Sequence, residues 1–440
     1  MVKLSLKHGS VFLKGVFWDE KIQSASREKL EEAQLKLLRA QLKRVYENSR
    51  FYRRKFTQAK VDPSQIRELA DIRKIPFTTR KELEGNFKEI VAIPWGKVAA
   101  LRMTTGTMGT PLTIAHSKKD LEDVAEATAR KLTYHGVTGE DVVQVTASYG
   151  LWQGAWSIHS GAEKIGCCII PVGSGNTERQ IRIIKQFGTT VLYGVTNYHF
   201  RIAEVAKQHG DDMRSSNLKI GICVAEKPTK SQIDLLKKEF GYETVAIDYG
   251  ATEFPGFSVH CAENPDSHHV WADYHLVETV TPDTREPVEN GVRGELVVTT
   301  LQREAFPLIR YLSNDVTELK DVEECECGMS HPKIGIDIDR IDYMTKIRGT
   351  PVFPSRIEYI LREFSDLTGR NQIVLDKRTP KQHVLLRIEK SEELSQAEQE
   401  SLRTKLRLEI RNRIGVTIDE FEFVPSGTFE MKFKKSIVLT

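Results

Sequence analysis

Short apolar runs rich in β-branched residues alternate with runs of helical period between Ser117 and Tyr249. Short strands that alternate with helices are typical of a mainly parallel sheet covered on both faces. We therefore expect an α/β fold whose ligands bind beyond the carboxyl ends of the strands. The predicted strands cover residues 142–145, 167–172, 190–193, 219–224 and 245–249. The predicted helices begin at Ser117 (with Asp120 in a capping box), Thr177 (with Gln180), about Tyr198, and Thr229.

The flanking segments predict the rest of the architecture. Residues 20–48 have the pattern of one helix with an apolar face of Leu35, Leu38, Leu42, Val45 and Tyr46. From about His260 to Leu319, strands such as 295–300 alternate with turn residues, which indicates a β-rich subdomain. Beyond Asp339, strands at 373–375 and 384–388 precede a helix capped by Ser395 and stopped by Gly415. We expect a large N-terminal domain over residues 1–338 and a small α+β C-terminal domain over residues 339–440.

Length and composition exclude several classes of protein. The chain has 440 residues, of which 40% are hydrophobic and 28% charged, and its net charge is +3. So small a charge predicts neither nucleic-acid binding nor attachment to a membrane surface. Residues 1–21 do not resemble a secretory signal and no apolar segment is long enough to span a bilayer, so we expect a cytoplasmic protein. The six cysteines are then free thiols or metal ligands.

The segment T-T-G-T-M-G-T-P, residues 104–111, is the strongest candidate for binding chemistry. Two glycines and four threonines leave free backbone N–H groups that can surround a phosphate chain. Neither G-x-x-x-x-G-K-[ST] nor G-x-G-x-x-G is present. Taken alone, a flexible polar hairpin explains the segment equally well.

Motifs along the whole chain match one enzyme family in order and at its spacing. They are F-W-D-E at Phe17, I-P-F-T-T-R at 75–80, the loop at 104–111 (usually S-S-G-T-T-G-K-P), Y-G-A-T-E at 249–253, I-R-Y-L-S-N-D at 309–315, D-R-I-D-Y-M-T-K-I-R-G at 339–349 and V-F-P-S-R-I-E at 352–358. On these motifs the sequence resembles the acyl-adenylate-forming superfamily and, within it, the phenylacetate-coenzyme A ligase family. The resemblance implies that ATP and Mg²⁺ activate an aromatic, arylacetate- or benzoate-like acid as acyl-AMP, and that coenzyme A then accepts the acyl group.

The resemblance also assigns roles to particular residues. Glu253 would lie near the Mg²⁺ ion, a task suited to a hard oxygen ligand. Asp315 would bind the ribose hydroxyls with help from Arg340. Taken in isolation, either residue is better explained by an ordinary surface ion pair, and only the flanking motif favours the ribose role. The loop residues that would hold the departing pyrophosphate are Thr104, Thr105, Gly106, Thr107 and Gly109. The residues that would line the rest of the nucleotide are Ala225, Glu226, Tyr249, Gly250, Ala251 and Thr252.

A lysine near the end of the chain would complete the adenylation site. The segment P-S-G-T-F-E-M-K-F-K-K-S resembles the family's closing motif and places the catalytic lysine at Lys435, with Lys434 as the runner-up. Its ammonium would stabilise charge that appears only in the transition state. Lys434 replaces the family's glycine, so a basic solvated tail remains the alternative. The resemblance further implies that the small domain turns about a hinge at Asp342 between the two half-reactions.

The cysteines suggest a second site. Related ligases carry C-x-C-G near Cys325, and some hold a structural zinc ion there, so the candidate ligands are Cys261, His269, Cys325 and Cys327. His260, His268 and His331 are rival imidazoles, and free thiols with surface histidines are an equally good alternative. The remaining cysteines, Cys167, Cys168 and Cys223, fall on predicted buried strands and are expected in the core.

The expected acyl pocket lies in the segment 147–156. Tyr149, Gly150, Trp152 and Trp156 would form an aromatic-walled slot, although core packing explains these aromatics equally well. Ala155 and Trp156 replace small family residues, and Thr110 replaces a loop lysine. The expected partners are the aromatic acid, ATP and coenzyme A, with a homodimer as an option. Two other functions stay open: adenylation with transfer to an amine, a carrier protein or a deazaflavin, and nucleotide binding without turnover.

Overall fold

The computed structural model describes residues 4–7, 10–13, 16–104, 111–320, 325–341, 345–347, 350–376, 383–429 and 437–439. The chain divides into two compact units. The large unit comprises Met1–Ser313 and Thr317–Asp337, and the small unit comprises Asn314–Val316 and Ile338–Thr440. Within the described ranges, no helix combines the length and apolar character needed to cross a bilayer.

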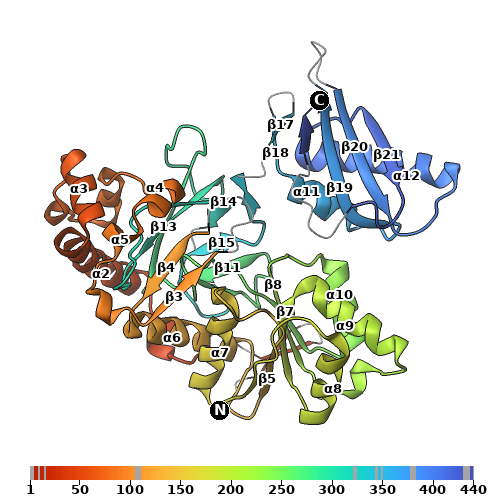
Figure 1. The fold of residues 1–440 in the computed structure, drawn as a ribbon, viewed down its shortest axis with the longest axis horizontal. Helices are drawn as coiled ribbons and strands as arrows, with labels where there is room; N and C mark the ends of the chain where they lie inside the picture. The colour runs from red at the N-terminus through yellow and green to blue at the C-terminus, as the bar shows by residue number, and fades with distance from the viewer. Residues whose placement is uncertain are drawn as a thin grey trace. The chain divides into compact units, whose positions relative to one another are not determined.

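A five-stranded parallel sheet forms one half of the large unit, as the alternation of the sequence predicts. Its strand order is β6-β5-β7-β8-β9, and every neighbouring pair is parallel. The strands are β5 (Val142–Val145), β6 (Cys168–Ile170), β7 (Val191–Val195), β8 (Ile220–Val224) and β9 (Thr244–Ile247). Helices α6 (Lys118–Tyr134) and α7 (Gln153–Ile165) cover one face (Figure 1). Helices α8 (Thr177–Phe187), α9 (Thr196–Gln208) and α10 (Lys230–Phe240) cover the other.

Several boundaries and burial assignments differ from the sequence predictions. The predicted strand 167–172 shortens to β6, which is an edge strand, and Cys168 is exposed and Cys167 half-buried rather than in the core. Because β6 pairs with one strand only, β5, its other edge is open, and this explains the exposure of the two cysteines. The cap of α8 is Asn176, whose side chain accepts from the Arg179 amide, rather than Thr177. The capping box of Ser117 with Asp120 and the buried position of Cys223 are confirmed.

The predicted helix 20–48 is two helices, α1 (Glu20–Gln23) and α2 (Arg27–Asn48). They separate because Ser26 is in an extended conformation and its side chain caps α2. Leu38, Leu42 and Val45 are buried as predicted, whereas Tyr46 is 40% exposed. The short helices that follow are α3 (Arg50–Gln58), η1 (Pro63–Gln65), η2 (Leu69–Lys74), α4 (Arg80–Gly85), α5 (Phe87–Ile90), η3 (Trp95–Lys97) and, after α9, η4 (Met213–Ser215).

The β-rich part of the large unit is built on a second sheet, as predicted from the turn residues after His260. Its strand order is β10-β11-β15-β14-β13-β12. The strands are β10 (Ser258–His260), β11 (Ser267–Val270), β12 (His275–Val280), β13 (Arg293–Thr300), β14 (Tyr311–Lys320) and β15 (Lys333–Gly335). Two antiparallel ribbons also belong to this unit: β1 (Leu4–Lys7) with β2 (Ser10–Leu13), and β3 (Ala100–Met103) with β4 (Thr113–His116).

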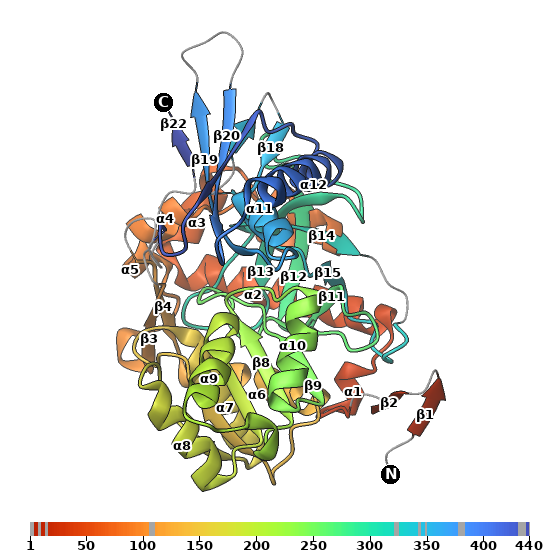
Figure 2. The same cartoon turned by 90° about the vertical axis from the view of Figure 1, so that its right-hand side faces the viewer.

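The small unit has the α+β fold that the sequence predicts. Its four-stranded sheet has the order β21-β20-β19-β22, from β19 (Leu367–Asp376), β20 (His383–Lys390), β21 (Glu420–Val424) and β22 (Ile437–Leu439). Helices α11 (Pro354–Leu361) and α12 (Gln396–Ile414) pack their apolar side chains against it (Figure 2). Ser395 and Glu398 form the expected capping box, and Gly415 ends α12. The other strands are β16 (Asp339–Arg340), β17 (Thr345–Ile347) and β18 (Thr350–Val352).

Candidate active site

The parallel sheet gathers three of the predicted segments at its carboxyl edge. Ala225 and Glu226 follow β8, residues 249–253 follow β9, and the aromatic segment that begins at Tyr149 follows β5. These strands point the same way, so their carboxyl ends open to the same side of the sheet. Ala225 has a φ of 70°, a left-handed conformation that costs energy for a residue with a Cβ atom and that clusters at functional sites.

Glu253 follows β9, the last strand in the order of this sheet, and two side chains hold it in place. Its residue is 6% exposed, and its Oε1 atom accepts hydrogen bonds from Arg80 Nη1 at 3.1 Å and from the Tyr311 hydroxyl at 3.2 Å. Arg80 lies at the start of α4, and Tyr311 lies at the start of β14. The two donors fix the direction of this carboxylate, and a carboxylate oxygen is a suitable ligand for Mg²⁺.

Arg80 also reaches the base of the glycine-threonine loop. Its Nη2 atom donates to Thr104 Oγ1 at 3.0 Å. The Thr104 amide donates to the Leu112 carbonyl at 3.0 Å, and the Leu112 amide donates back to Thr104 Oγ1 at 2.9 Å. These bonds fix both ends of the loop close to Glu253. The loop residues Thr105, Gly106, Thr107, Gly109 and Thr110 lie outside the described residues.

Tyr249 is held in place by two residues at the start of the second sheet, Ser258 and Phe257. Its carbonyl accepts a hydrogen bond from Ser258 Oγ at 3.0 Å, and its ring meets the ring of Phe257 edge-on at 5.8 Å. The preceding residue, Asp248, forms an ion pair with the buried Lys131. Thr252 is buried, whereas Gly250 is exposed and Ala251 half-buried. The segment therefore has a fixed backbone with an accessible surface at Gly250.

The predicted ribose-binding pair belongs to the small unit. Asp315 of β14 and Arg340 of β16 are register partners, and Arg340 Nη1 lies 2.8 Å from Asp315 Oδ1. The carboxyl side chain is 6% exposed and the guanidinium side chain is 38% exposed. The Arg340 side chain is therefore accessible to a ligand, and the buried Asp315 carboxylate is held by its ion pair with Arg340. The expected hinge, Asp342, and the expected lysines, Lys434 and Lys435, lie outside the described residues.

The aromatic residues of the expected acyl pocket form one cluster. The rings of Tyr149 and Trp156 meet edge-on at 5.0 Å, and the Tyr149 hydroxyl lies 3.1 Å from His159 Nδ1. Trp156 Nε1 donates to the Gly150 carbonyl at 3.1 Å. The Trp152 ring covers Gly154 so closely that a Cβ there would lie 2.2 Å from it. Burial raises the pKa of Tyr149 to about 12, so its hydroxyl is neutral at physiological pH.

The four predicted zinc ligands lie together. One ligand atom from each of Cys261, His269, Cys325 and Cys327 falls within 4.8 Å of the others, and all four residues are buried. Cys261 Sγ lies 3.7 Å from Cys325 Sγ, and Cys327 Sγ lies 3.3 Å from His269 Nε2. These separations are those of neighbouring ligands in a tetrahedral site with Zn–S bonds of about 2.3 Å.

Neighbouring groups orient His269 and favour the thiolate form of Cys261. His269 Nδ1 donates to the His331 carbonyl at 2.9 Å, which leaves the Nε2 lone pair facing the sulfurs. The contact with Cys327 and the hydrogen bonds with His269 lower the pKa of Cys261, and thiolate is the form that binds metals. The ammonium of Lys333 lies 3.3 Å from Cys325 Sγ, where it would offset part of the negative charge of metal-bound thiolates. The residues therefore fit a structural Zn²⁺ ion.

The contacts of the three rival histidines distinguish them from His269 as candidate metal ligands. Both ring nitrogens of His331 are occupied, since Nδ1 accepts from the Ala272 amide at 3.1 Å and Nε2 contacts the Ile22 carbonyl at 3.1 Å. His260 Nε2 contacts the Pro265 carbonyl at 2.9 Å. None of the three rivals, which include the buried His268, joins the ligand cluster. Among the described histidines, His269 is the one that faces the three cysteines.

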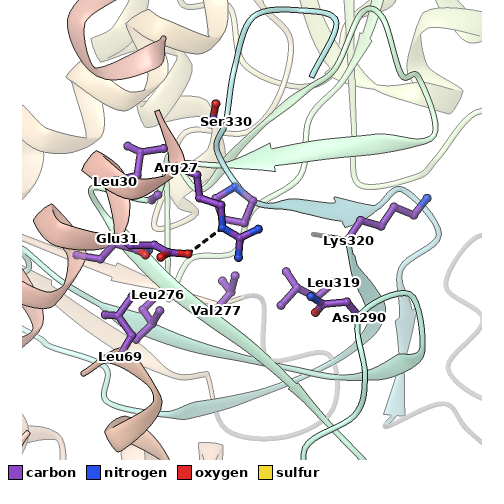
Figure 3. Close-up of a pocket in the computed structure, with 13 residues that line it drawn as sticks. Arg27, Leu30, Glu31, Leu69, Leu276, Val277, Asn290, Leu319, Lys320 and Ser330 are labelled. Carbon is purple, nitrogen blue, oxygen red and sulfur yellow. Dashed lines mark hydrogen bonds and ion pairs between the residues drawn. The ribbon is translucent and has the colours of Figure 1, made fainter. Parts of the chain in front are cut away.

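A separate hollow of about 160 Å³ opens elsewhere in the large unit (Figure 3). Arg27 and Glu31 of α2 form an ion pair at its rim at 2.8 Å, and both side chains are exposed. Leu276, Val277 and Leu319 provide its apolar wall. None of its thirteen lining residues is among the predicted site residues. We therefore do not assign the substrate to this hollow.

The sequence reasoning did not single out Arg80 and Tyr311, the two residues that hold Glu253. A signal for both was present, because Arg80 ends the motif I-P-F-T-T-R and Tyr311 belongs to I-R-Y. They lie 173 and 58 residues from Glu253 in the sequence, so no local pattern links them to it.

Comparisons with known proteins identify the family. The model of the AMP-binding enzyme family matches residues 12–302, and that of the AMP-binding enzyme C-terminal domain matches residues 349–440. A phenylacetate-coenzyme A ligase of Thermus thermophilus is 32% identical over 430 residues, which cover 94% of this chain and 96% of that protein. A phenylacetate-coenzyme A ligase of Escherichia coli is 32% identical over 407 residues, which cover 90% of this chain and 92% of that protein.

A solved structure supports the same assignment. The crystal structure of a 2-hydroxyisobutyryl-CoA ligase in the postadenylation state, in complex with 2-HIB-AMP, superposes with a TM-score of 0.85 at 26% identity. The match covers 96% of this chain and 92% of that chain. The predicted α/β architecture with a small α+β domain is therefore confirmed. The chain belongs to the AMP-binding enzymes of the acyl-adenylate-forming superfamily and, within them, to the phenylacetate-coenzyme A ligase family of AMP-forming acid–thiol ligases.

Proposed function

We propose that this enzyme activates an aromatic carboxylic acid with ATP as an acyl-AMP and then transfers the acyl group to coenzyme A. The observation that carries this proposal is the position of Glu253, a buried carboxylate joined through Arg80 to the base of the glycine-threonine loop. The aromatic cluster around Tyr149 and Trp156 supports a ring-bearing acid. Relatives named phenylacetate-coenzyme A ligases support the same substrate class and acceptor.

The chemistry requires two negatively charged reactants to approach each other. The acid's carboxylate oxygen attacks the α-phosphorus of ATP, and pyrophosphate leaves. Glu253 would hold Mg²⁺, which when bound neutralises phosphate charge. The loop amides would hold the departing pyrophosphate. Lys435 would place its ammonium beside the reacting oxygen, where charge develops in the transition state.

We also propose that the small unit serves both half-reactions. Asp315 with Arg340 would bind the ribose, and the chain around Asp342 would act as the hinge. After adenylation, a turn about this hinge would withdraw Lys435 and allow the thiol of coenzyme A to attack the acyl carbon, which releases AMP. In this proposal, residues 1–338 form the N-terminal domain and residues 339–440 form the C-terminal domain that turns.

Cys261, His269, Cys325 and Cys327 would hold a structural Zn²⁺ ion. All four ligands come from the protein and are buried, so the site has no open position for substrate. The ion would stabilise the β-rich part of the large unit.

Pyrophosphate exchange into ATP tests the proposed function directly. The full-length enzyme would be assayed with arylacetic acids, benzoic acids and short hydroxy acids, followed by detection of thioester with coenzyme A. We expect exchange to be fastest with an aromatic acid and to be followed by thioester formation. Absence of exchange with every acid would reject adenylation. Acyl-AMP that accumulates in the presence of coenzyme A, but reacts with an amine, would reject the acceptor.

A further inference from the structure

Arg102 of β3 is a half-buried cation without an acidic partner. Its Nη1 atom donates to the Leu101 carbonyl at 3.1 Å, whereas its Nε atom is buried and meets no hydrogen-bond acceptor among the described residues. Within the same ranges, no carboxylate forms an ion pair with this guanidinium. Burial lowers the pKa of Arg102, because no neighbouring anion offsets the loss of water. A covered donor without an acceptor costs free energy, so this arginine indicates a ligand that supplies the acceptor.

Arg102 lies against the aromatic cluster of the expected acyl pocket. Its guanidinium carbon is 4.9 Å from the centre of the Trp156 ring, which is a cation–π contact. The backbone joins the same two segments, because the Met103 amide donates to the Leu151 carbonyl at 2.8 Å. Tyr149, which meets Trp156 edge-on, extends the cluster. The cation is therefore held beside the rings, at the place where the proposed function puts the ring of the acid.

We propose that Arg102 determines substrate specificity, and that the preferred acid carries an oxygen acceptor on its ring, either a second carboxylate or a hydroxyl, to which the Arg102 guanidinium donates. This inference rests on the proposed function, because it requires an aromatic acid in this cluster. A plain hydrocarbon ring would cover the guanidinium further and leave its donors unpaired. A site built to hydrogen-bond a substituent rejects the analogue that lacks it for this reason.

Two other roles for Arg102 make a different prediction. If Arg102 bound the reacting carboxylate, its loss would slow every acid alike, because every acid carries that group. If Arg102 only packed against Trp156, its loss would also affect all acids alike. The contacts of Arg102 favour the ring, since they are made with the aromatic cluster, whereas Glu253 is held by Arg80 and Tyr311. A comparison among ring substituents therefore separates the roles.

The test is pyrophosphate exchange into ATP by the full-length enzyme, with phenylacetic acid and its meta- and para-substituted carboxyl, hydroxyl and methyl derivatives. A methyl group has nearly the size of a hydroxyl but accepts no hydrogen bond. We expect kcat/KM for the favoured carboxyl or hydroxyl acid to exceed that of its methyl counterpart by about 10- to 100-fold, the range for a hydrogen bond to a charged group. The carboxyl and hydroxyl derivatives together identify the acceptor.

Variants test whether Arg102 is the cause of this preference. We expect Arg102→Met to remove the preference while kcat/KM for the methyl acid stays within about twofold or rises, because an apolar side chain leaves no donor unpaired. Arg102→Lys keeps the charge without the planar fork, so we expect it to keep part of the preference. Arg201→Met is the matched control and should keep all of it, because Arg201 pairs with Glu204 on the exposed face of α9.

The outcomes separate this inference from the proposed function. Equal kcat/KM for methyl and acceptor-bearing acids in the wild-type enzyme, or an equal fall for every acid in Arg102→Met, would overturn the role of Arg102 and leave the proposed function standing. A wild-type enzyme that shows no exchange with any acid would instead reject the proposed function. Exchange with the methyl acid shows that Arg102→Met is folded, and the comparison within the wild-type enzyme needs no variant.

Discussion

At the scale of single residues, the site depends on side chains that hold other side chains in place. Arg80 and Tyr311 orient Glu253, and the His331 carbonyl orients His269. Such supporting contacts fix the direction of a ligand side chain before any metal or nucleotide binds. In both candidate sites, the direction of the ligand side chain therefore depends on the residues that support it as well as on the ligand itself.

The cysteine cluster makes a prediction at this scale. We expect the purified enzyme to contain about one equivalent of zinc per chain, and the Cys325→Ser/Cys327→Ser variant to contain none, because two of the four ligands are lost. Elemental analysis by mass spectrometry measures this ratio. Cys168→Ser is the matched control, since Cys168 is exposed and lies outside the cluster. Equal zinc content in all three proteins would contradict the assignment.

At the scale of elements, close packing of α6 against α7 supports the carboxyl edge of the parallel sheet. Gly161 of α7 lies against Thr128 of α6, and a Cβ at this glycine would come within 2.6 Å of the Thr128 Cβ atom. Both helices cover the face of the sheet whose strand β5 leads into the aromatic segment. The position of Tyr149 and Trp156 therefore depends on this contact.

Gly161→Val tests this dependence. We expect the substitution to lower the free energy of unfolding by about 1–3 kcal/mol or more, since a larger side chain must force the two helices apart. Urea denaturation followed by circular dichroism gives the change in midpoint. The matched control is Gly96→Val, because a Cβ at Gly96 meets no atom within 4 Å. Similar midpoints for the two variants would show that the helix contact tolerates the added volume.

Elements were predicted well from the sequence where local chemistry determines them. The capping boxes of Ser117 and Ser395 mark helix starts because side chain and backbone lie within one turn. Burial was predicted less well, since Cys168 is exposed on an edge strand and strand order is not encoded by local pattern. The contacts of Arg80 with Glu253 were missed for the same reason. Long-range contacts depend on how the helices and strands are arranged in space, and the periodicity of the sequence does not predict that arrangement.

At the scale of the whole molecule, the division into two units matches a reaction with two steps. The large unit holds Glu253 and the base of the loop, and the small unit holds Asp315 and Arg340. The lysine that the resemblance assigns to adenylation, Lys435, also belongs to the small unit. An enzyme with this division can change its catalytic groups by moving one unit rather than by rebuilding a site.

Lys435→Ala tests the separation of the two steps. We expect the variant to lose acyl-AMP formation, because no ammonium would stabilise the reacting oxygen, but to form thioester from synthetic acyl-AMP and coenzyme A at close to the wild-type rate. Pyrophosphate exchange and thioester assays measure the two steps independently. Lys434→Ala is the neighbouring control and should retain both. Loss of both steps in Lys435→Ala, or of neither, would reject the assignment.

The cysteine cluster has a consequence for the life of the protein in a cell. Cys261 and Cys325 are 64 residues apart in the chain, so an ion bound between them closes a long loop and restricts the unfolded ensemble. Under the zinc proposal, newly made chains would compete for a scarce nutrient metal before they become resistant to proteases. The amount of enzyme would then follow metal supply, even though the metal takes no part in turnover.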